Sequence, residues 1–76
     1  MTVEDLVRQQ LDPDNFPRNL RTLRVLRGLN QEQLSRASGV DPSTISLLEN
    51  GKQKPRPGTL RKLAKVLDVS PEILKG

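Results

Sequence analysis

The sequence contains no cysteine and no histidine, and a single phenylalanine is its only aromatic residue. Disulfides and thiolate metal sites are therefore excluded, and an ordinary zinc site would need carboxylates alone. We expect no metal and no cofactor. A nucleophile would have to be a serine with a lysine or aspartate partner. The sequence shows no such grouping and no glycine-rich phosphate loop, so it favours a protein that is not an enzyme.

Long apolar runs are also missing from the chain. No stretch approaches the roughly 20 residues of a membrane helix, and the N-terminus lacks the basic-then-apolar pattern of a signal peptide. We therefore expect no membrane association and a cytoplasmic location. The 76 residues make one small domain. A core of this size is thin, and oligomerisation often supplies the missing burial.

Charge is distributed unevenly along the chain. Residues 1–17 carry one Arg and four acidic residues, a net charge of −3. Residues 18–76 carry 12 Lys or Arg and five acidic residues, a net charge of +7. A basic body of this size fits a polyanionic partner such as nucleic acid, and a merely solubilising surface is the alternative.

Apolar periodicity and turn residues predict an all-α chain without strands. An N-terminal helix is expected at about 2–11, followed by a proline-containing break at 12–17. Five helical segments are expected after the break, at about 17–27, 31–38, 42–50, 57 or 59–68, and in a last turn from 71. We therefore predict an amphipathic arm at 1–15 and a folded domain at 16–76.

Capping residues mark the two central helices. Asn30 is placed to cap the 31–38 helix, Gln33 stands at the third helical position to return the bond, and Gly39 suits a left-handed end. Asp41 can cap the helix that follows. Two short helices joined by such a turn are typical of a helix-turn-helix, which places its second helix in the major groove of DNA.

The inward positions of the helices define a predicted core. It consists of Phe16, Leu20, Leu23, Leu34, Ile45, Leu48, Leu60, Leu63, Ala64 and Leu67. Two further apolar sets are candidates for a dimer interface, namely Val3, Leu6, Val7 and Leu11 in the arm and Val69, Ile73 and Leu74 at the end. As alternatives, the arm packs on its own body, for example against Val25, and part of the C-terminal set closes the core.

The 42–50 helix has one outward arc of small and polar residues. On a helical wheel, this arc contains Pro42, Ser43, Ser46, Leu47 and Asn50. Small side chains allow a helix to sit deep in a groove, serine can bond base edges, and leucine can touch a thymine methyl. We therefore predict base contacts by Pro42, Ser43, Ser46 and Leu47. A plain solvated face with one stray leucine is the alternative.

Phosphate contacts are predicted around the same helix. Gln31 stands at a helix start, where free backbone N–H groups and the helix dipole suit a phosphate. The loop at 52–56 is basic and stiffened by proline, although many loops of this kind are merely solvated. The predicted phosphate contacts are Arg24, Gln31, Thr44, Asn50, Lys52, Lys54 and Arg56.

Four motifs occur in an order and spacing that resemble a known family. They are LNQEQL at 29–34, GVD at 39–41, ISLLENGK at 45–52 and PRPGTLRKLAKVL at 55–67. The chain from about 16 to 74 resembles the phage repressor and Cro helix-turn-helix family, also called the xenobiotic-response-element type. Several motifs in register make the match specific. The resemblance implies a five-helix repressor-like fold, with residues 1–15 as an extra arm.

The resemblance also implies roles for particular residues. It implies a structural ion pair between Arg24 and Glu49 that orients the arginine toward DNA phosphate, and a Gln31 that reaches the DNA backbone from the groove edge. Two independent surface charges, worth about 0–1 kcal/mol as a pair, are the alternative for Arg24 and Glu49. The chain departs from the family at Ser35, where alanine is usual, and at Leu47, where a polar or basic residue is frequent. The second departure bears on sequence preference.

The function implied by the resemblance is sequence-specific binding of double-stranded DNA by a transcriptional regulator, with repression as the expected mode. A homodimer would place two recognition helices in successive major grooves, about 34 Å apart. The alternatives are a protein-interaction adaptor built on the same fold, or an antitoxin whose arm binds a toxin. Salt-dependent DNA binding would separate the regulator from the adaptor.

Overall fold

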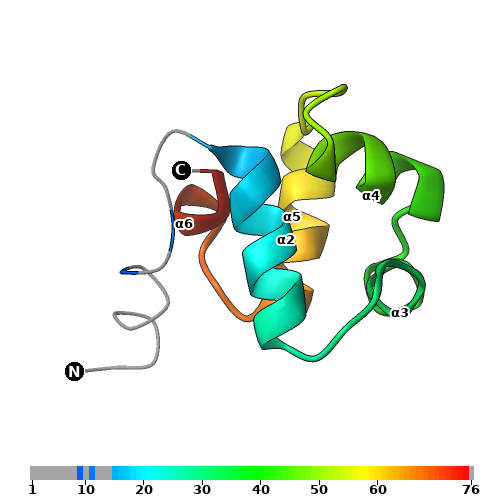
Figure 1. The fold of residues 1–76 in the computed structure, drawn as a ribbon, viewed down its shortest axis with the longest axis horizontal. Coiled ribbons are helices and arrows are strands. Elements are labelled where there is room, and N and C mark those ends of the chain that lie inside the picture. Colours follow the sequence, from blue (N-terminus) through cyan, green and yellow to red (C-terminus); the bar gives the residue numbers. More distant parts are fainter. Residues whose placement is uncertain (1–8, 10, 12–14, 76) are drawn as a thin grey trace.

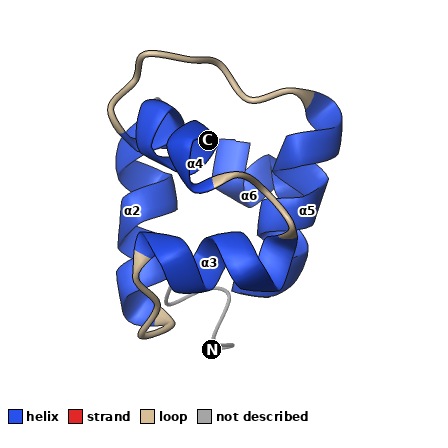
Figure 2. Ribbon diagram, turned by 90° about the vertical axis from the view of Figure 1, so that its right-hand side faces the viewer, coloured by secondary structure: helices blue, strands red, loops and turns tan. Residues whose placement is uncertain are grey.

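The computed structural model describes residues 9, 11 and 15–75, and Figure 1 shows how the chain winds through five helices. They are α2 (Phe16–Leu26), α3 (Gln31–Ser38), α4 (Pro42–Glu49), α5 (Pro57–Leu67) and α6 (Pro71–Lys75). Figure 2 shows only helices and loops in the described part of the chain. The all-α prediction with five helices after the break is confirmed. The arm residues Val3, Leu6 and Val7 lie outside the described residues.

Capping bonds fix both helices of the helix-turn-helix unit. The Asn30 side chain accepts a bond from the Gln33 backbone N–H at 2.7 Å, and the Gln33 side chain accepts one from the Asn30 N–H at 2.8 Å. Gly39 ends α3 with a φ of 77°, a left-handed conformation that glycine adopts without a steric penalty. The Asp41 carboxylate then accepts a bond from the Ser43 N–H at 2.9 Å and starts α4.

Four helix boundaries differ from the sequence-based expectation by one residue, including the ends of α2 at Leu26 and of α4 at Glu49. Helix α2 begins one residue early, at Phe16, because the Asn15 side chain caps it by accepting a bond from the Arg18 N–H at 3.2 Å. Helix α5 ends at Leu67, one residue before the expected end. Asp68 there takes a left-handed φ of 57°, which aspartate tolerates better than most residues.

The helices are arranged so that the helix-turn-helix unit forms one side of the domain. Helix α2 contacts α4 and α6, α3 contacts α4 and α5, and α5 contacts α6. Figure 1 shows α3 and α4 on one side of α2 and α6 on the other side, and Figure 2 shows α3 and α4 from the side on which they lie. Within the described residues, no helix has the length and apolar character needed to cross a membrane.

The core draws buried side chains from all five helices. Every residue predicted for the core is buried except Phe16, which is half-buried and packs against the cluster. Val40, in the turn before α4, is an additional buried residue that the helical periodicity did not include. Burial of these side chains packs α4 against α2 and α3.

The C-terminal apolar set belongs mainly to this core. Leu74 has no exposed surface, Ile73 is 8% exposed, and Val69 is half-buried against the cluster. The burial of Ile73 and Leu74 agrees with the alternative that part of this set closes the core, and a side chain buried inside one subunit has little area left for another. Leu11, the one member of the arm stripe among the described residues, is also half-buried against the core.

Candidate nucleic-acid interface

Helix α4, the second helix of the helix-turn-helix unit, has one buried and one open face. Ile45 and Leu48 have no exposed surface, and Glu49 is only 5% exposed. Three of the predicted base-contacting residues, Pro42, Ser43 and Leu47, are exposed, and the fourth, Ser46, is half-buried. The open face therefore consists of a proline, two small hydroxyl side chains and one leucine, and it carries no charge.

The structure brings two predicted contact residues together at the end of this face. Asn50 is the C-cap residue of α4, and its side-chain amide donates to the Ser46 hydroxyl at 3.4 Å. The contact places an amide and a hydroxyl one helical turn apart on the same side of α4. Thr44, predicted as a phosphate contact, is half-buried near the helix start.

Glu49 provides a buried carboxylate at the end of α4, and Arg24 of α2 binds both of its oxygens. Arg24 Nε donates to Oε2 at 2.7 Å, and Nη2 donates to Oε1 at 2.9 Å. Arg24 Nη1 donates to the Leu29 carbonyl at 2.8 Å. The side chains of Arg24 and Glu49 are 13% and 0% exposed, so this is an internal pair and not two independent surface charges.

The pair keeps both partners charged inside the domain. Burial raises the pKa of the Glu49 carboxyl, but the hydrogen bond and charge of Arg24, assisted by bonds from Gln31 and Arg21, bring that pKa below its usual range. The hydrogen bond to Glu49 raises the pKa of the Arg24 guanidinium against the opposing effect of burial. Removing either partner would leave an uncompensated charge, so the pair ties α4 to α2.

Two longer contacts reach the same carboxylate. Gln31 Nε2 and Arg21 Nε each lie 3.5 Å from Glu49 Oε1. Gln31 thereby connects the start of α3 to the end of α4, beside the Arg24 pair. Arg21 was not among the residues predicted from the sequence. The available signal was its spacing, three residues before Arg24, which places both arginines on neighbouring positions of one helix.

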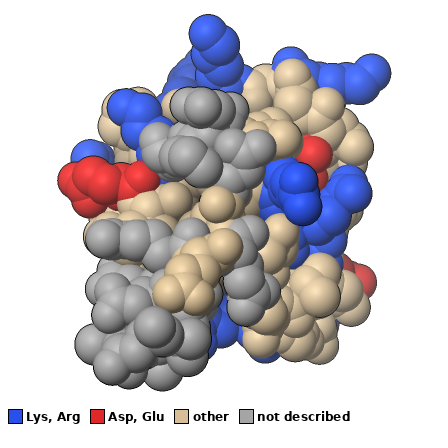
Figure 3. All heavy atoms as spheres, turned by 60° about the vertical axis from the view of Figure 1, so that its left-hand side comes forward, with Lys and Arg blue, Asp and Glu red and all other residues tan. Residues whose placement is uncertain are grey.

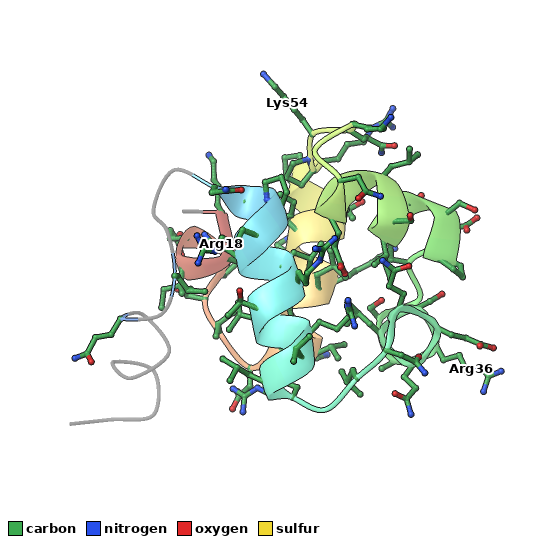
Figure 4. All side chains as sticks on the ribbon, viewed as in Figure 1. Arg18, Arg36 and Lys54 are labelled. Carbon is green, nitrogen blue, oxygen red and sulfur yellow. The ribbon has the colours of Figure 1, made fainter. Side chains whose placement is uncertain are left out.

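The loop between α4 and α5 carries three exposed cations, Lys52, Lys54 and Arg56. Figure 4 shows Lys54 projecting away from the body of the domain at this loop. Arg56 is also the N-cap residue of α5, and no side chain caps that helix start. The loop therefore combines exposed positive charges with free backbone N–H groups, both of which suit a phosphate.

Acidic side chains are sparse on the described surface. Apart from the buried Glu49, the described residues include only the exposed Glu32, Asp41, Asp68 and Glu72. Figure 3 accordingly shows Lys and Arg atoms at several places around the face it presents, with few Asp or Glu atoms. Glu32 pairs with Arg36 at 2.6 Å on the outer side of α3. No group of metal-ligating side chains occurs in the described part of the chain.

Comparison with known protein families matches this architecture. A family model described as helix-turn-helix covers residues 20–74. The chain belongs to this helix-turn-helix family. The resemblance to phage repressors is likewise confirmed by a relative, the cryptic phage CTXphi transcriptional repressor RstR of Vibrio cholerae. It is 43% identical over 54 residues, which cover 71% of this chain and 49% of the relative.

Two further relatives fit the same helix-turn-helix family. The HTH-type transcriptional repressor RghR of Bacillus subtilis is 44% identical over 57 residues, covering 74% of this chain and 42% of the relative. The crystal structure of the restriction-modification controller protein C.AhdI from Aeromonas hydrophila is similar with a TM-score of 0.76 and 38% identity. That match covers 83% of this chain and 96% of the controller. The chain spans less than half the length of the curated relatives RghR and RstR.

Proposed function

We propose that this chain is a DNA-binding transcription regulator that reads a specific double-stranded sequence with α4 and represses transcription by occupying that site. The observation that carries the proposal is the division of α4. Its inner face is buried in the core, while its outer face of Pro42, Ser43, Ser46 and Leu47 is open or half-open and uncharged. The second helix of a helix-turn-helix has this position when it lies in a major groove.

Each residue of the outer face has a distinct capability. The short side chains of Ser43 and Ser46 let the helix axis approach the groove floor, and their hydroxyls can donate to or accept from base edges. The 40% exposed Leu47 offers methyl groups to a thymine C5-methyl. Pro42 at the helix start adds apolar contact and has no N–H group of its own to satisfy. These side chains favour recognition of base edges through hydroxyl groups and of thymine through its methyl group, and not recognition of guanine by arginine.

The phosphate contacts surround this face on two sides. Lys52, Lys54 and Arg56 would bind the backbone beyond the end of α4, where Asn50 adds an amide. Gln31, at the start of α3, and Thr44, in the first turn of α4, would bind it on the other side. Arg24 would bind a phosphate through the guanidinium N–H groups that do not bond to Glu49 or Leu29.

Two copies of the chain bind together on the DNA in this proposal. A homodimer places two α4 helices about 34 Å apart on one face of the duplex. Val3, Leu6 and Val7 of the arm stripe supply the contact, since Ile73 and Leu74 are buried in the core and Leu11 packs against it. Val25 and Leu26 of α2 are 60% and 49% exposed, and the arm of the other copy would cover them. Leu47, the other large exposed apolar residue among those described, lies on the outer face of α4. Sedimentation of the full chain beside a form starting at residue 14 tests this arrangement.

The experiment that tests the proposed function is selection of bound sites from random double-stranded DNA, followed by titration of the selected site at several salt concentrations. We expect one enriched motif and an affinity that falls steeply as salt rises, because phosphate contacts release counterions. An unenriched pool together with flat salt dependence would contradict DNA reading and would favour a protein-interaction adaptor on the same fold.

A further inference from the structure

We propose that Arg21 is an additional phosphate contact of this domain and that Glu49 orients its guanidinium. The inference rests on the proposed DNA-binding function and adds a residue to it. The structure places Arg21 Nε 3.5 Å from Glu49 Oε1, while the Arg21 side chain remains 57% exposed. Arg21 therefore lies at the edge of an internal charge cluster and still faces solvent.

The charge balance of the cluster leaves Arg21 in excess. Arg24 already binds both oxygens of Glu49 at 2.7 and 2.9 Å, and a guanidinium and a carboxylate neutralise each other in that arrangement. Arg21 places a second positive charge beside the same carboxylate, so the three side chains together carry a net charge of +1. The most exposed of the three carries that excess, and it is available to an anion from outside.

The contact lengths show which bond would persist. The Arg24 bonds are short and almost fully shielded from solvent, whereas the Arg21 contact is at the outer limit of hydrogen-bond length. Only Arg21 Nε takes part in it, and among the described residues the two Nη groups have no partner. The weak contact restricts where the guanidinium lies without using the pair of N–H groups that suits a phosphate.

The surroundings of Arg21 favour a phosphate. Gln31 Nε2 contacts the same Glu49 oxygen at 3.5 Å, so Arg21 lies beside the first residue of α3. The N-terminal end of that helix adds a partial positive charge. Glu49 itself repels an approaching phosphate little, because its side chain has no exposed surface and is paired with Arg24. A phosphate at the start of α3 would therefore meet the Nη groups of Arg21.

Arg21→Ala tests the proposal against Arg36→Ala as a matched control. Both changes remove one exposed arginine and alter the net charge equally. Arg36 lies on the outer side of α3 and pairs with the exposed Glu32, far from α2 (Figure 4). Affinity for the selected site and for random DNA of equal length would be measured over a salt series, together with the melting temperature of each variant.

For Arg21→Ala we expect the log–log salt slope to become shallower by about 0.9, the value for one lost phosphate contact. Affinity should fall by a similar factor on selected and random DNA, with a nearly unchanged melting temperature. Arg36→Ala should keep the wild-type slope. Arg21→Lys, which retains the charge, should keep most of the slope as well.

Three results would overturn the inference. The first is an Arg21→Ala slope equal to that of Arg36→Ala. The second is a clear fall in melting temperature with an unchanged slope, which would make Arg21 a structural partner of Glu49. The third is a loss confined to the selected site, which would make Arg21 a base contact. If the wild-type chain itself shows no salt-dependent DNA binding, the proposed function fails too, and this outcome is distinct from a change seen only in the variant.

Discussion

Helix α4 presents two faces that differ in what their side chains touch. Ile45 and Leu48 on the inner face have no exposed surface, whereas Ser43 and Leu47 on the outer face are open to solvent. Inner residues are constrained by packing density, so a change of even one methylene is felt there. Outer residues have few neighbours and contribute little to stability. The difference teaches that one helix of eight residues can stabilise the fold through one face and recognise a partner through the other.

The polar end of the inner face extends this contrast. Glu49 is buried with the apolar residues, yet it is held by charge and hydrogen bonds to Arg24 of α2. Hydrophobic contacts hold α4 against the core without fixing its direction closely, while a carboxylate bound at both oxygens requires one geometry. The pair therefore sets how the outer face is presented.

The largest effect on stability is expected when the two adjacent leucines, one on each face, are replaced by alanine in separate variants. Leu48→Ala should lower the free energy of unfolding by roughly 2–5 kcal/mol, because it removes buried methyl groups and leaves a cavity. Leu47→Ala should change it by no more than about 0.5 kcal/mol, since its side chain is 40% exposed. Urea denaturation of both variants measures the difference. Equal losses would break the distinction between the faces.

A smaller loss of stability is expected from Glu49→Gln. The substitution should cost about 1–3 kcal/mol, because it leaves the Arg24 guanidinium without a charged acceptor. Urea denaturation at neutral pH, with Glu32→Gln on the exposed pair as the control, measures it. A cost no greater than that of the control would show that the buried pair does not hold α4.

The same pair predicts a dependence on pH. Because the folded-state pKa of Glu49 lies below its usual range, its stabilising effect is fully present above the ordinary glutamate pKa of about 4.3. The effect is lost as pH falls from that value through the lower folded pKa. As pH falls from 5 to about 3 and below, the free energy of unfolding should therefore decrease more for the wild-type protein than for Glu49→Gln. Parallel pH profiles would contradict this account of the pair.

On the outer face, changes should alter DNA preference and spare the fold. Ser43→Ala is expected to cost about 1–2 kcal/mol on the selected site, within the range of a base contact, and little on random DNA. Binding isotherms on both DNAs, with a melting curve for the variant, measure the ratio. An unchanged ratio of specific to random binding would remove Ser43 from the base-reading set.

The smallest and least selective effect is expected in the loop after α4. Lys54→Ala should weaken selected and random DNA equally and make the log–log salt slope shallower by about 1. Lys75→Ala is a matched control, because Lys75 is an exposed lysine on α6, on the other side of the domain. A slope change of the same size in the control would indicate a general charge effect and no contact at the loop.

Much of the fold could be predicted from the sequence because helical periodicity and capping are local signals. The spacing of Leu20, Leu23 and Leu48 identified inward positions, and Asn30 with Gln33 identified the start of α3. Local signals say which side of a helix is buried but not what buries it. For this reason the sequence left Ile73 and Leu74 as candidates both for a dimer interface and for closing the core, and the structure buries them in the core.

Polar residues in the interior were harder to predict. Asn19 has no exposed surface, although nothing in its type or spacing distinguishes it from a solvent-facing asparagine. Glu49 could be placed only through the family resemblance. For Arg21 the sequence offered only its spacing to Arg24, because its contact with Glu49 joins positions 28 residues apart. The candidate base and phosphate contacts follow from exposure and position on α4 and its flanks. Their roles remain predictions until DNA binding is measured.

The most direct test of the central claim, that the outer face of α4 reads DNA, is site selection by the wild-type chain and by Leu47→Gln from the same random pool. Leu47 is exposed, so the substitution leaves the core intact. The wild type should enrich a motif containing a thymine that Leu47 contacts, and the variant should shift that position toward adenine, whose N6 and N7 glutamine can bind. Identical motifs from both proteins, at equal melting temperatures, would contradict the account.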